Sequence, residues 1–297
     1  MSRLQCSVGV IVYNEAENIG KLLDALLTQK LDRVEIEHIF VISSACTDGT
    51  DDIVRRYEKQ NRKLTLITEP ERRGKSAAIN VFIKAAASEV LIIESGDTIP
   101  AAETVEKMVA PFIDPKIGMT GGRPLPENDP TTFIGYAVNL LWNLHHRMAL
   151  QSPKLGEMVA FRKVFDQIPP ESAVDEASIE AIMKEKGLEL KYIPDAIVHN
   201  KGPENLADFI KQRRRIETGH LWLKKCQNYE VSSQNHQLLI KLAAEEIKRH
   251  PGKIFFLFGT ACLEIYSRLL GSYDFKIKKK NPFKWDIANS TKKLEHK

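Results

Sequence analysis

The chain has 297 residues, of which 43% are hydrophobic and 28% are charged. This length allows one large domain or two ordinary ones, and the composition excludes a disordered, collagen-like or polytopic membrane protein. The formal charge of +4 is unevenly placed, because residues 274–297 contain eight Lys and only three acidic residues. The rest of the chain is close to neutral, so binding to nucleic acid is not expected.

The cysteines and the N-terminus indicate a cytoplasmic protein. Cys6, Cys46, Cys226 and Cys262 are scattered and form no CxxC pair, as is typical of reduced thiols. The first residues contain no long apolar segment before a small-residue cleavage site, so secretion is not expected.

The first 95 residues alternate between short apolar runs and helical patterns. The predicted strands are Cys6–Tyr13, Glu37–Ser43, Leu64–Thr68 and Glu89–Ile93. The predicted helices between them are Ala16–Gln29, Thr50–Asn61 and Lys75–Ala87. This alternation predicts an α/β fold, with a mostly parallel sheet flanked by helices and ligands bound beyond the carboxyl ends of its strands.

The middle of the chain is less regular, and Gly118–Pro130 is predicted to be a loop. The later predicted helices are Thr132–Leu150, Val174–Lys186, Leu206–Lys225 and Gln237–His250, and the later strands are Glu189–Ile193 and Ala196–Val198.

The segment Ile254–Leu270 is strongly apolar, but its uninterrupted run ends at Glu264, so we expect it to be too short to span a bilayer. It is either a packed helix or an interfacial helix. In the second case a peripheral membrane contact forms through residues 254–284, and each nearby Lys adds about 1 kcal/mol of attraction to anionic lipid. These lysines are Lys276, Lys278, Lys279, Lys280 and Lys284.

Polar motifs follow the predicted strands in a fixed order. They are Tyr13-Asn14-Glu15, the run from Ser43 to Thr50, the run from Glu71 to Asn80, and Glu94-Ser95-Gly96-Asp97. Each motif alone is equally typical of a capped turn. As an ordered set they resemble the family 2 glycosyltransferases of the GT-A fold, which carry a YNE turn, a DGSTDGT-like turn, a GK helix start and a D-x-D. The resemblance covers about residues 5–225.

This resemblance implies a GT-A (Rossmann-like) domain over residues 1–230, with a donor half to about residue 100 and an acceptor half over 101–230. A C-terminal helical extension would follow over 231–297. The implied activity is the transfer of a sugar from a nucleotide-diphosphate sugar to an acceptor hydroxyl, with inversion. The acceptor stays open among a small molecule, a glycan and a lipid-linked compound.

The donor is expected at the strand-end loops, where basic groups beside Gly74 would bind its diphosphate; the alternative is a solvated basic loop. Ser43 and Ser44 stand where members that use uridine nucleotides commonly have two Asp, so the donor base stays open between uridine and guanosine. The donor-binding candidates are Tyr13, Asn14, Glu15, Ser43, Ser44, Arg73, Lys75, Ser95, Asp97 and Arg215.

The resemblance also implies a divalent cation, Mg²⁺ or Mn²⁺, beside the diphosphate. Asp97 matches the second Asp of the D-x-D, whereas Ser95 replaces the first, and Glu94 lies next to it. This departure leaves the metal requirement open. His199 resembles the late His that is a further metal ligand in many such enzymes, although a buried structural histidine is an equal alternative.

The catalytic candidates are Glu176 and Asp175, which resemble the family's E-D pair at a helix start. Glu176 would remove the proton of the acceptor hydroxyl, while the alternative is that both carboxylates offset the helix dipole. Lys211–Ile216 resembles a Q-x-x-R-W motif whose Trp is replaced by Ile216. The acceptor-binding candidates are Gly122, Arg123, Gly156, Glu157 and Gln212.

Two other classes of function stay open. The first is a non-catalytic nucleotide-sugar or lipid-binding module of the same fold. The second is a sugar-phosphate nucleotidyltransferase, which is disfavoured because Tyr13-Asn14-Glu15 stands where that class needs a Gly-rich basic loop.

Overall fold

The computed structural model describes residues 3–231, 236–281, 283–284, 289–291 and 294. Its strands are β1 (Leu4–Val12), β2 (Val34–Ser44), β3 (Leu64–Glu69), β4 (Val90–Ser95), β5 (Thr98–Pro100), β6 (Ile117–Pro126), β7 (Val159–Arg162) and β8 (Glu189–Asn200). Its helices are α1 (Ile19–Leu27), α2 (Thr50–Gln60), α3 (Lys75–Ala85), α4 (Thr104–Val109), α5 (Phe133–Ala149), α6 (Asp175–Glu185), α7 (Leu206–Gln227), α8 (His236–Arg249) and α9 (Ile254–Lys276).

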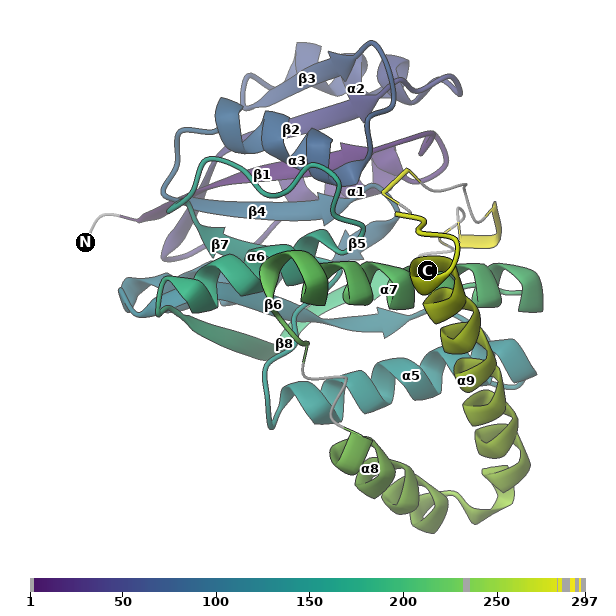
Figure 1. Cartoon of the computed structure of the whole chain (residues 1–297). Helices are drawn as coiled ribbons and strands as arrows, with labels where there is room; N and C mark the ends of the chain where they lie inside the picture. Colours follow the sequence, from purple (N-terminus) through teal and green to yellow (C-terminus); the bar gives the residue numbers. More distant parts are fainter. Residues whose placement is uncertain (1–2, 232–235, 282, 285–288, 292–293, 295–297) are drawn as a thin grey trace.

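The strands form one sheet in the order β3-β2-β1-β4-β7-β6-β8-β5 (Figure 1). The first four strands of this order are parallel, β7 runs antiparallel to both of its neighbours, and β6 and β8 are parallel to each other. The mostly parallel sheet and the alternation of the first half are therefore confirmed.

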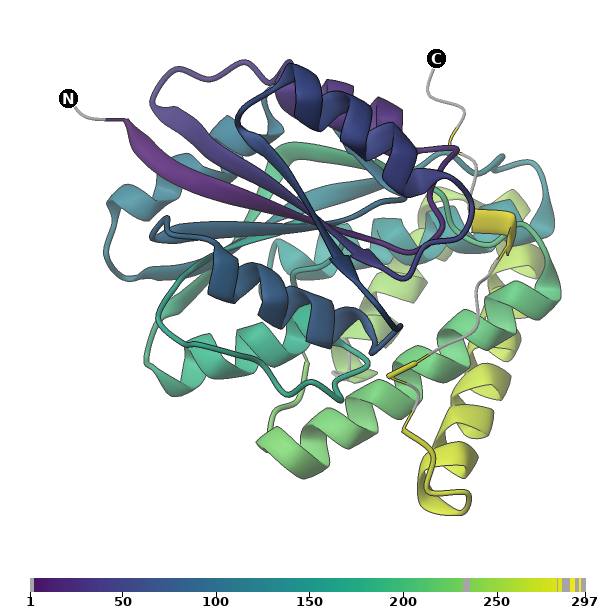
Figure 2. The same ribbon diagram turned by 90° about the horizontal axis from the view of Figure 1, so that it is seen from above.

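Helices cover both faces of the sheet (Figure 2). Buried residues of α1, α2 and α4 pack against one face, and those of α3 and α6 pack against the other. The predicted helices of the first half form because their apolar residues recur on one side, so each helix buries one face. The loops after β1, β2 and β4 consequently meet at one edge of the sheet.

The prediction of a loop over Gly118–Pro130 is wrong, because most of this segment forms the buried strand β6. Its Gly and Pro content is typical of turns, but Gly121 serves here for close packing. A Cβ atom on Gly121 would lie 2.7 Å from Leu155 Cβ. The two short strands predicted over residues 189–198 are the single strand β8, whose pairing with β6 shifts register between Gly121 and Arg123.

The C-terminal helix α9 packs along α7 through partly buried ion pairs. Arg213 donates two hydrogen bonds to Glu264, at 2.7 and 2.6 Å, and Arg214 pairs with Asp274. The helices approach closely at Gly271, where a Cβ atom would lie 2.6 Å from the Arg214 carbonyl oxygen. The helix α9 is therefore fixed to the rest of the protein along one side.

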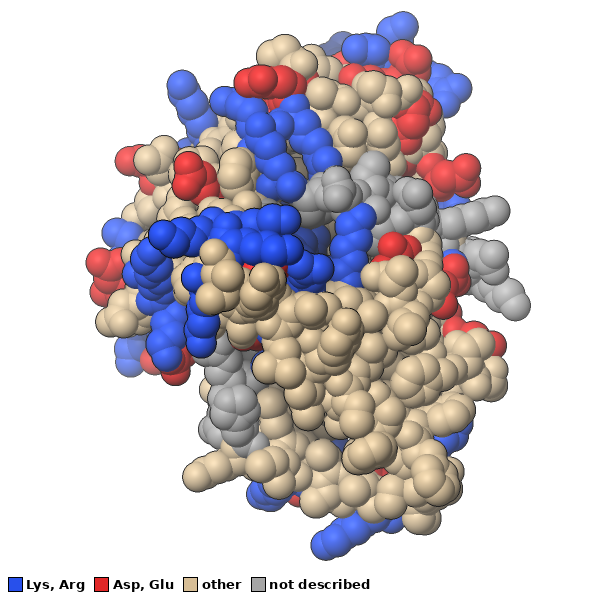
Figure 3. Space-filling view, turned by 45° about the vertical axis from the view of Figure 1, so that its right-hand side comes forward, with Lys and Arg blue, Asp and Glu red and all other residues tan. Residues whose placement is uncertain are grey.

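The other side of α9 is exposed and apolar (Figure 3). Its exposed large side chains are Ile254, Phe255, Phe258, Ile265, Tyr266, Leu269 and Tyr273, with Ile277 just beyond the helix end. The stretch Pro251–Lys276 is long and apolar enough to cross a membrane by length and composition, although this is weak evidence for a span. The helix extends well past the apolar run that the sequence indicates.

Candidate functional site

A cavity of about 910 Å³ opens at the edge of the sheet where β1 and β4 end. One end is lined by the strand-end loops, and the other by α5 and α7. Tyr13, Glu15, Ser44, Lys75, Ser95 and Asp97 line the first end. The position agrees with the rule that ligands bind beyond the carboxyl ends of parallel strands.

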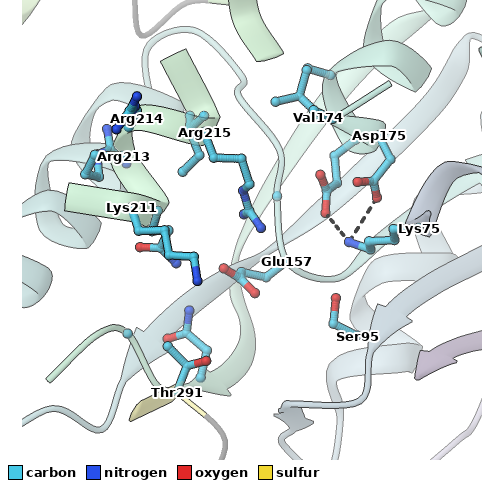
Figure 4. Close-up of a pocket in the computed structure, with 18 of the residues that line it drawn as sticks. Lys75, Ser95, Glu157, Val174, Asp175, Lys211, Arg213, Arg214, Arg215 and Thr291 are labelled. Carbon is cyan, nitrogen blue, oxygen red and sulfur yellow. Dashed lines mark hydrogen bonds and ion pairs between the residues drawn. The ribbon is translucent and has the colours of Figure 1, made fainter. Parts of the chain in front are cut away.

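The centre of the site is a Lys between two carboxylates (Figure 4). Lys75, the first residue of α3, places its Nζ 2.9 Å from Asp175 Oδ2 and 3.0 Å from Glu176 Oε1. The two carboxylates begin α6, where negative charge also offsets the helix dipole. The sequence separation between Lys75 and α6 is about 100 residues, so only the fold brings the three groups together.

The Lys75 charge affects the two carboxylates differently. Desolvation opposes ionisation of Glu176, but the Lys75 ammonium outweighs it and lowers the Glu176 pKa. Desolvation and the neighbouring Glu176 raise the pKa of Asp175. Glu176 is therefore the better candidate for an ionised carboxylate at neutral pH.

Asp97 shares the cavity with a second carboxylate, that of Glu157. Desolvation and then the charges of Asp97 and Glu176 raise the pKa of Glu157 to about 7. Glu157, in the loop before β7, has a left-handed backbone with φ of 62°. This strained conformation points to a constrained position in the site. A cation would relieve the repulsion between these carboxylates.

Glu94 does not reach the cavity. It is 1% exposed and accepts a hydrogen bond from Thr98 Oγ1 at 3.0 Å. Burial raises its pKa well above the ordinary value, with a smaller contribution from Asp97. Burial thus disfavours the charged form of Glu94, and because its side chain does not line the cavity it does not replace the carboxylate that Ser95 lacks. Ser95 itself lines the cavity.

The first strand-end loop presents an aromatic ring to the cavity. The guanidinium of Arg72 stacks on Tyr13, with its Cζ 4.0 Å from the ring centroid, and both residues line the cavity. Glu15 also lines it, whereas Asn14 turns away and accepts a hydrogen bond from the Thr47 N–H at 2.8 Å. Asn14 adopts φ of 54°, so its part is to shape the turn.

The second strand-end loop depends on a buried carboxylate that the sequence does not single out. Ser44 donates a hydrogen bond to Glu69 Oε2 at 2.8 Å, and Arg73 pairs with Glu69 Oε1 at 2.6 Å. Ser44 lines the cavity, while Ser43 is fully buried and donates to Asp51. Arg73 thus neutralises Glu69 and does not line the cavity, whereas its neighbour Arg72 does.

The helix α7 supplies the wall opposite Lys75. Gln212 and Arg215 line the cavity, and Arg215 extends toward Glu157 (Figure 4). Gly156 lines it as well. The predicted acceptor residues Gly122 and Arg123 lie in β6, among residues that do not line the cavity.

The structure does not bring His199 to the cavity. Its Nδ1 lies 3.9 Å from Glu127 Oε1, and its neighbour Asn200 is the residue of β8 that lines the cavity. Side chains alternate along a strand, so the two point to opposite sides. Asn200 also donates a side-chain hydrogen bond to Glu157.

The described part of the C-terminal tail passes over the cavity. Asn281, Phe283, Lys284 and Thr291 line it. Ser290 Oγ donates to Asp208 at 2.5 Å, and the buried Leu294 donates its N–H to Asn18 Oδ1 at 3.1 Å. No motif in the sequence indicates this path, because it depends on contacts with residues 82 and 276 positions away.

Comparisons with known proteins agree with this geometry. The sequence profile described as "Glycosyl transferase family 2" matches residues 7–182. Glycosyltransferase AglE of Haloferax volcanii is 32% identical over 116 residues, which are 39% of this chain and 38% of AglE. Poly-beta-1,6-N-acetyl-D-glucosamine synthase of Staphylococcus aureus is 26% identical over 224 residues, which are 70% of this chain and 52% of the synthase.

A solved structure shows the same fold. The mannosyltransferase PcManGT from Pyrobaculum calidifontis, in complex with GDP-Man and Mn²⁺, is 23% identical with a TM-score of 0.61. The match covers 95% of this chain and 83% of that protein. The chain spans about half or less of the length of the two curated relatives above.

Proposed function

Because the chain belongs to glycosyl transferase family 2, we propose that it transfers a sugar from a nucleoside-diphosphate sugar to an acceptor hydroxyl, with inversion. The observation that carries this proposal is the Glu176–Lys75–Asp175 group, which faces the same cavity as Asp97 and the strand-end loops. One cavity thus contains a base and a donor-binding end.

In this proposal Glu176 accepts the proton of the acceptor hydroxyl as the oxygen attacks the anomeric carbon. The low pKa of Glu176 keeps the carboxylate ionised, and Lys75 fixes its position. Asp175 is the weaker candidate because its raised pKa favours the protonated form. Lys75 is consequently assigned to positioning the base, whereas Arg72 and Arg215 are the cations proposed for the diphosphate.

The residues present fit a divalent cation that takes few protein ligands. No group of three or more His, Cys, Asp or Glu that could hold a metal occurs among the described residues. The carboxylates of Asp97 and Glu157 line one cavity and repel each other, which favours a cation, and donor phosphates and water would complete its shell. We propose Asp97 as a ligand, without His199; the cation would offset charge on the leaving diphosphate.

The donor base is proposed to lie near Ser44 and Tyr13. The Ser44 hydroxyl donates its hydrogen to Glu69, so its oxygen is left as an acceptor for an N–H of the base. Both uracil and guanine carry such an N–H. The proposal therefore includes UDP- and GDP-sugars.

The exposed side of α9 is proposed to contact the surface of an anionic membrane. A row of apolar side chains is followed by Lys276, Lys278, Lys279 and Lys280, and Lys284 lies further along the tail. Such a surface matches the acyl boundary and the headgroups of a lipid bilayer. This would place a cytoplasmic enzyme at the membrane face, with its cavity beside α9.

The direct test of the function is turnover of UDP- and GDP-sugars by purified protein with Mn²⁺. We expect release of one nucleoside diphosphate, and we expect its loss in the Glu176→Gln variant. Nucleotide binding without any sugar transfer to acceptors of all three classes would favour the non-catalytic binding module.

A further inference from the structure

Asn200 lies beside Asp97 because two strands pair at this place. Gly96 and Asp97 form the turn between β4 and β5. The strand β5 runs antiparallel to β8, and Thr98, the residue after Asp97, lies opposite Asn200. Residues directly opposite each other in such a pair have Cβ atoms about 5 Å apart. The strand pairing therefore brings Asn200 to the turn that carries Asp97, although the two residues are distant in the sequence.

The side chain of Asn200 has an oxygen that no described residue uses. Asn200 is 5% exposed and lines the cavity. Its amide nitrogen donates a hydrogen bond to the Glu157 carboxylate, so the other end of the amide group is the oxygen. Within the described part of the chain, this Oδ1 has no hydrogen-bond partner. A buried oxygen without a partner costs free energy, so its position in the cavity indicates a ligand that carries a donor or a positive charge.

Glu157 belongs to the same group of oxygen-bearing side chains. It lies in the loop before β7 and lines the cavity. Its φ of 62° is in the left-handed region, which costs free energy for a residue other than Gly, so the loop fixes the side chain at this place. Among the neighbouring charges, that of Asp97 acts most strongly on Glu157. Asp97, Glu157 and Asn200 therefore bring oxygen atoms to one part of the cavity.

A divalent cation such as Mg²⁺ or Mn²⁺ fits this group. Mg²⁺ prefers oxygen ligands, and one or two carboxylates usually hold it together with substrate phosphates and water. Lys75 is already held by Asp175 and Glu176, at 2.9 and 3.0 Å. Arg215 extends toward Glu157 (Figure 4), but a carboxylate has two oxygens and can contact Arg215 and a metal ion at the same time. Neither cation therefore prevents a metal ion from binding Glu157.

The family motif lacks one of its two carboxylates in this chain. Ser95 stands where the D-x-D has its first Asp, and the buried Glu94 does not line the cavity. Ser95 and Glu157 both point into the cavity, from β4 and from the loop before β7 (Figure 4). A carboxylate on either element can therefore take part in the same site.

We propose that Glu157 replaces the first carboxylate of the D-x-D motif, so that Asp97, Glu157 and Asn200 Oδ1 together bind the divalent cation of the donor. This inference rests on the proposed function, because it completes the metal site of the same cavity. Two carboxylates and one amide oxygen are ligands that suit Mg²⁺ and Mn²⁺, and the donor phosphates and water fill the other positions. The loop before β7 and the end of β8, which no motif marks, thus belong to the donor site.

The test is a titration of the full chain with Mn²⁺, in which EPR measures the free ion, without nucleotide, with UDP and with GDP. We expect one of the two nucleotides to tighten Mn²⁺ binding to the wild type. Glu157→Gln should weaken Mn²⁺ binding by about tenfold or more, because the loss of even an outer-shell partner of a metal costs about 10–100-fold in affinity. Binding of the same nucleotide without metal should not weaken, since Glu157 contacts the cation and not the donor.

Two further variants separate a metal ligand from a residue that only shapes the loop. Ser95→Asp in the Glu157→Gln background returns a carboxylate to the motif and should restore most of the Mn²⁺ affinity. Asn200→Asp adds a charge to the ligand set and should tighten Mn²⁺ binding. The matched controls are Glu185→Gln and Asn143→Asp, which change exposed residues of α6 and α5 and should bind Mn²⁺ as the wild type does. Thermal melting of each variant confirms that it is folded.

Either of two results would overturn the inference. One is equal Mn²⁺ affinity in the wild type and in folded Glu157→Gln, and the other is a loss of Mn²⁺ affinity in Glu157→Gln that Ser95→Asp does not restore. Sugar transfer alongside either result would leave the proposed function standing. Failure to bind any nucleotide would instead remove the proposed function, while the Mn²⁺ titration without nucleotide would still compare the wild type with Glu157→Gln.

Discussion

The two ends of the cavity are built in different ways. At the donor end, the side chains come from loops that follow adjacent strands. Hydrogen bonds between these loops, such as that from the Thr47 N–H to Asn14, fix their conformation. At the end lined by α5 and α7, the side chains come from helices and a loop that meet only in the folded chain, and ion pairs such as that of Arg213 with Glu264 fix their positions. The donor end can therefore be recognised from short motifs, whereas the helical end can be recognised only from the tertiary structure.

The variant Glu176→Gln separates donor binding from sugar transfer, because Glu176 is proposed to act as the base and not to bind the donor. We expect it to lower turnover by about 10³-fold, because it removes the general base but keeps the shape of the side chain. Donor affinity should change little. Turnover is followed as release of the nucleoside diphosphate, and Glu185→Gln, exposed on the same helix, serves as the control. A Glu176→Gln enzyme with normal turnover would remove this residue as the base.

The variant Glu264→Gln tests how strongly the ion pairs between α7 and α9 stabilise the helical end of the cavity. Glu264 is partly buried and accepts charge-assisted hydrogen bonds from Arg213 and Arg268, so we expect its removal to lower the free energy of unfolding, measured with denaturant, by about 1.5–3 kcal/mol. The donor end should still bind nucleotide. A loss below about 1 kcal/mol would mean that the ion pairs contribute little to the docking of α9.

The same carboxylate predicts a pH effect. Desolvation opposes ionisation of Glu264, but Arg213 and Arg268 outweigh it and lower its pKa from 4.5 to about 2. The stabilisation is therefore complete above about pH 4.5 and is lost as the pH falls toward 2. Denaturant unfolding of the wild type should weaken over this range, and Glu264→Gln should lack this part of the dependence. A wild-type curve that matches the variant would contradict the assignment.

The variant Asp97→Asn tests the donor end alone. A nucleotide-sugar at a hundred times its dissociation constant adds about 2.7 kcal/mol to the free energy of unfolding. We expect the Mn²⁺-dependent part of this stabilisation and the Mn²⁺ stimulation of turnover to disappear. Ser95→Asp, which restores the first carboxylate of the family motif, should strengthen both effects. Unchanged Mn²⁺ stimulation in Asp97→Asn would show that Asp97 is not a ligand.

The smallest expected effect concerns the membrane contact. The double variant Lys278→Ala/Lys279→Ala should lower binding to anionic vesicles by about 2 kcal/mol, or roughly 30-fold, in a flotation assay. The matched control, Lys184→Ala/Lys186→Ala, removes two exposed lysines from the end of α6 and should bind as the wild type does. Equal binding of the wild type to neutral and anionic vesicles would contradict an electrostatic contact.

Much of the fold could be predicted from the sequence because the first half follows simple periodicity. Runs of Val and Ile form β1–β4 because these strands are buried between the helices. The apolar residues of α1–α3 lie on one side of each helix because that side packs against the sheet. The strand β6 could not be predicted, because a Gly that is needed for close packing looks the same in a single sequence as a Gly that is needed for a turn. Gly121 is of the first kind. The division into domains at residue 230 stays a prediction.

The candidate site shows the same limit. Lys75, Asp97, Asp175 and Glu176 line one cavity, because strand ends and helix starts determine their positions, and their roles stay predictions. Arg73 does not line the cavity because it pairs with the buried Glu69, and His199 does not because it points to the side of β8 opposite to Asn200. Glu69 and Asn200 belong to no motif, and their only signal in the sequence is a polar residue at the end of a strand.

In this account one cavity binds a nucleotide-sugar at the strand ends and holds the acceptor hydroxyl beside Glu176. The most direct measurement is thermal unfolding of the purified protein with UDP-, GDP-, ADP- and dTDP-sugars, each with and without Mn²⁺. We expect one nucleotide class to raise the melting temperature by about 5–10 °C near saturation, with a larger rise when Mn²⁺ is present. No rise with any of these nucleotides would contradict the account.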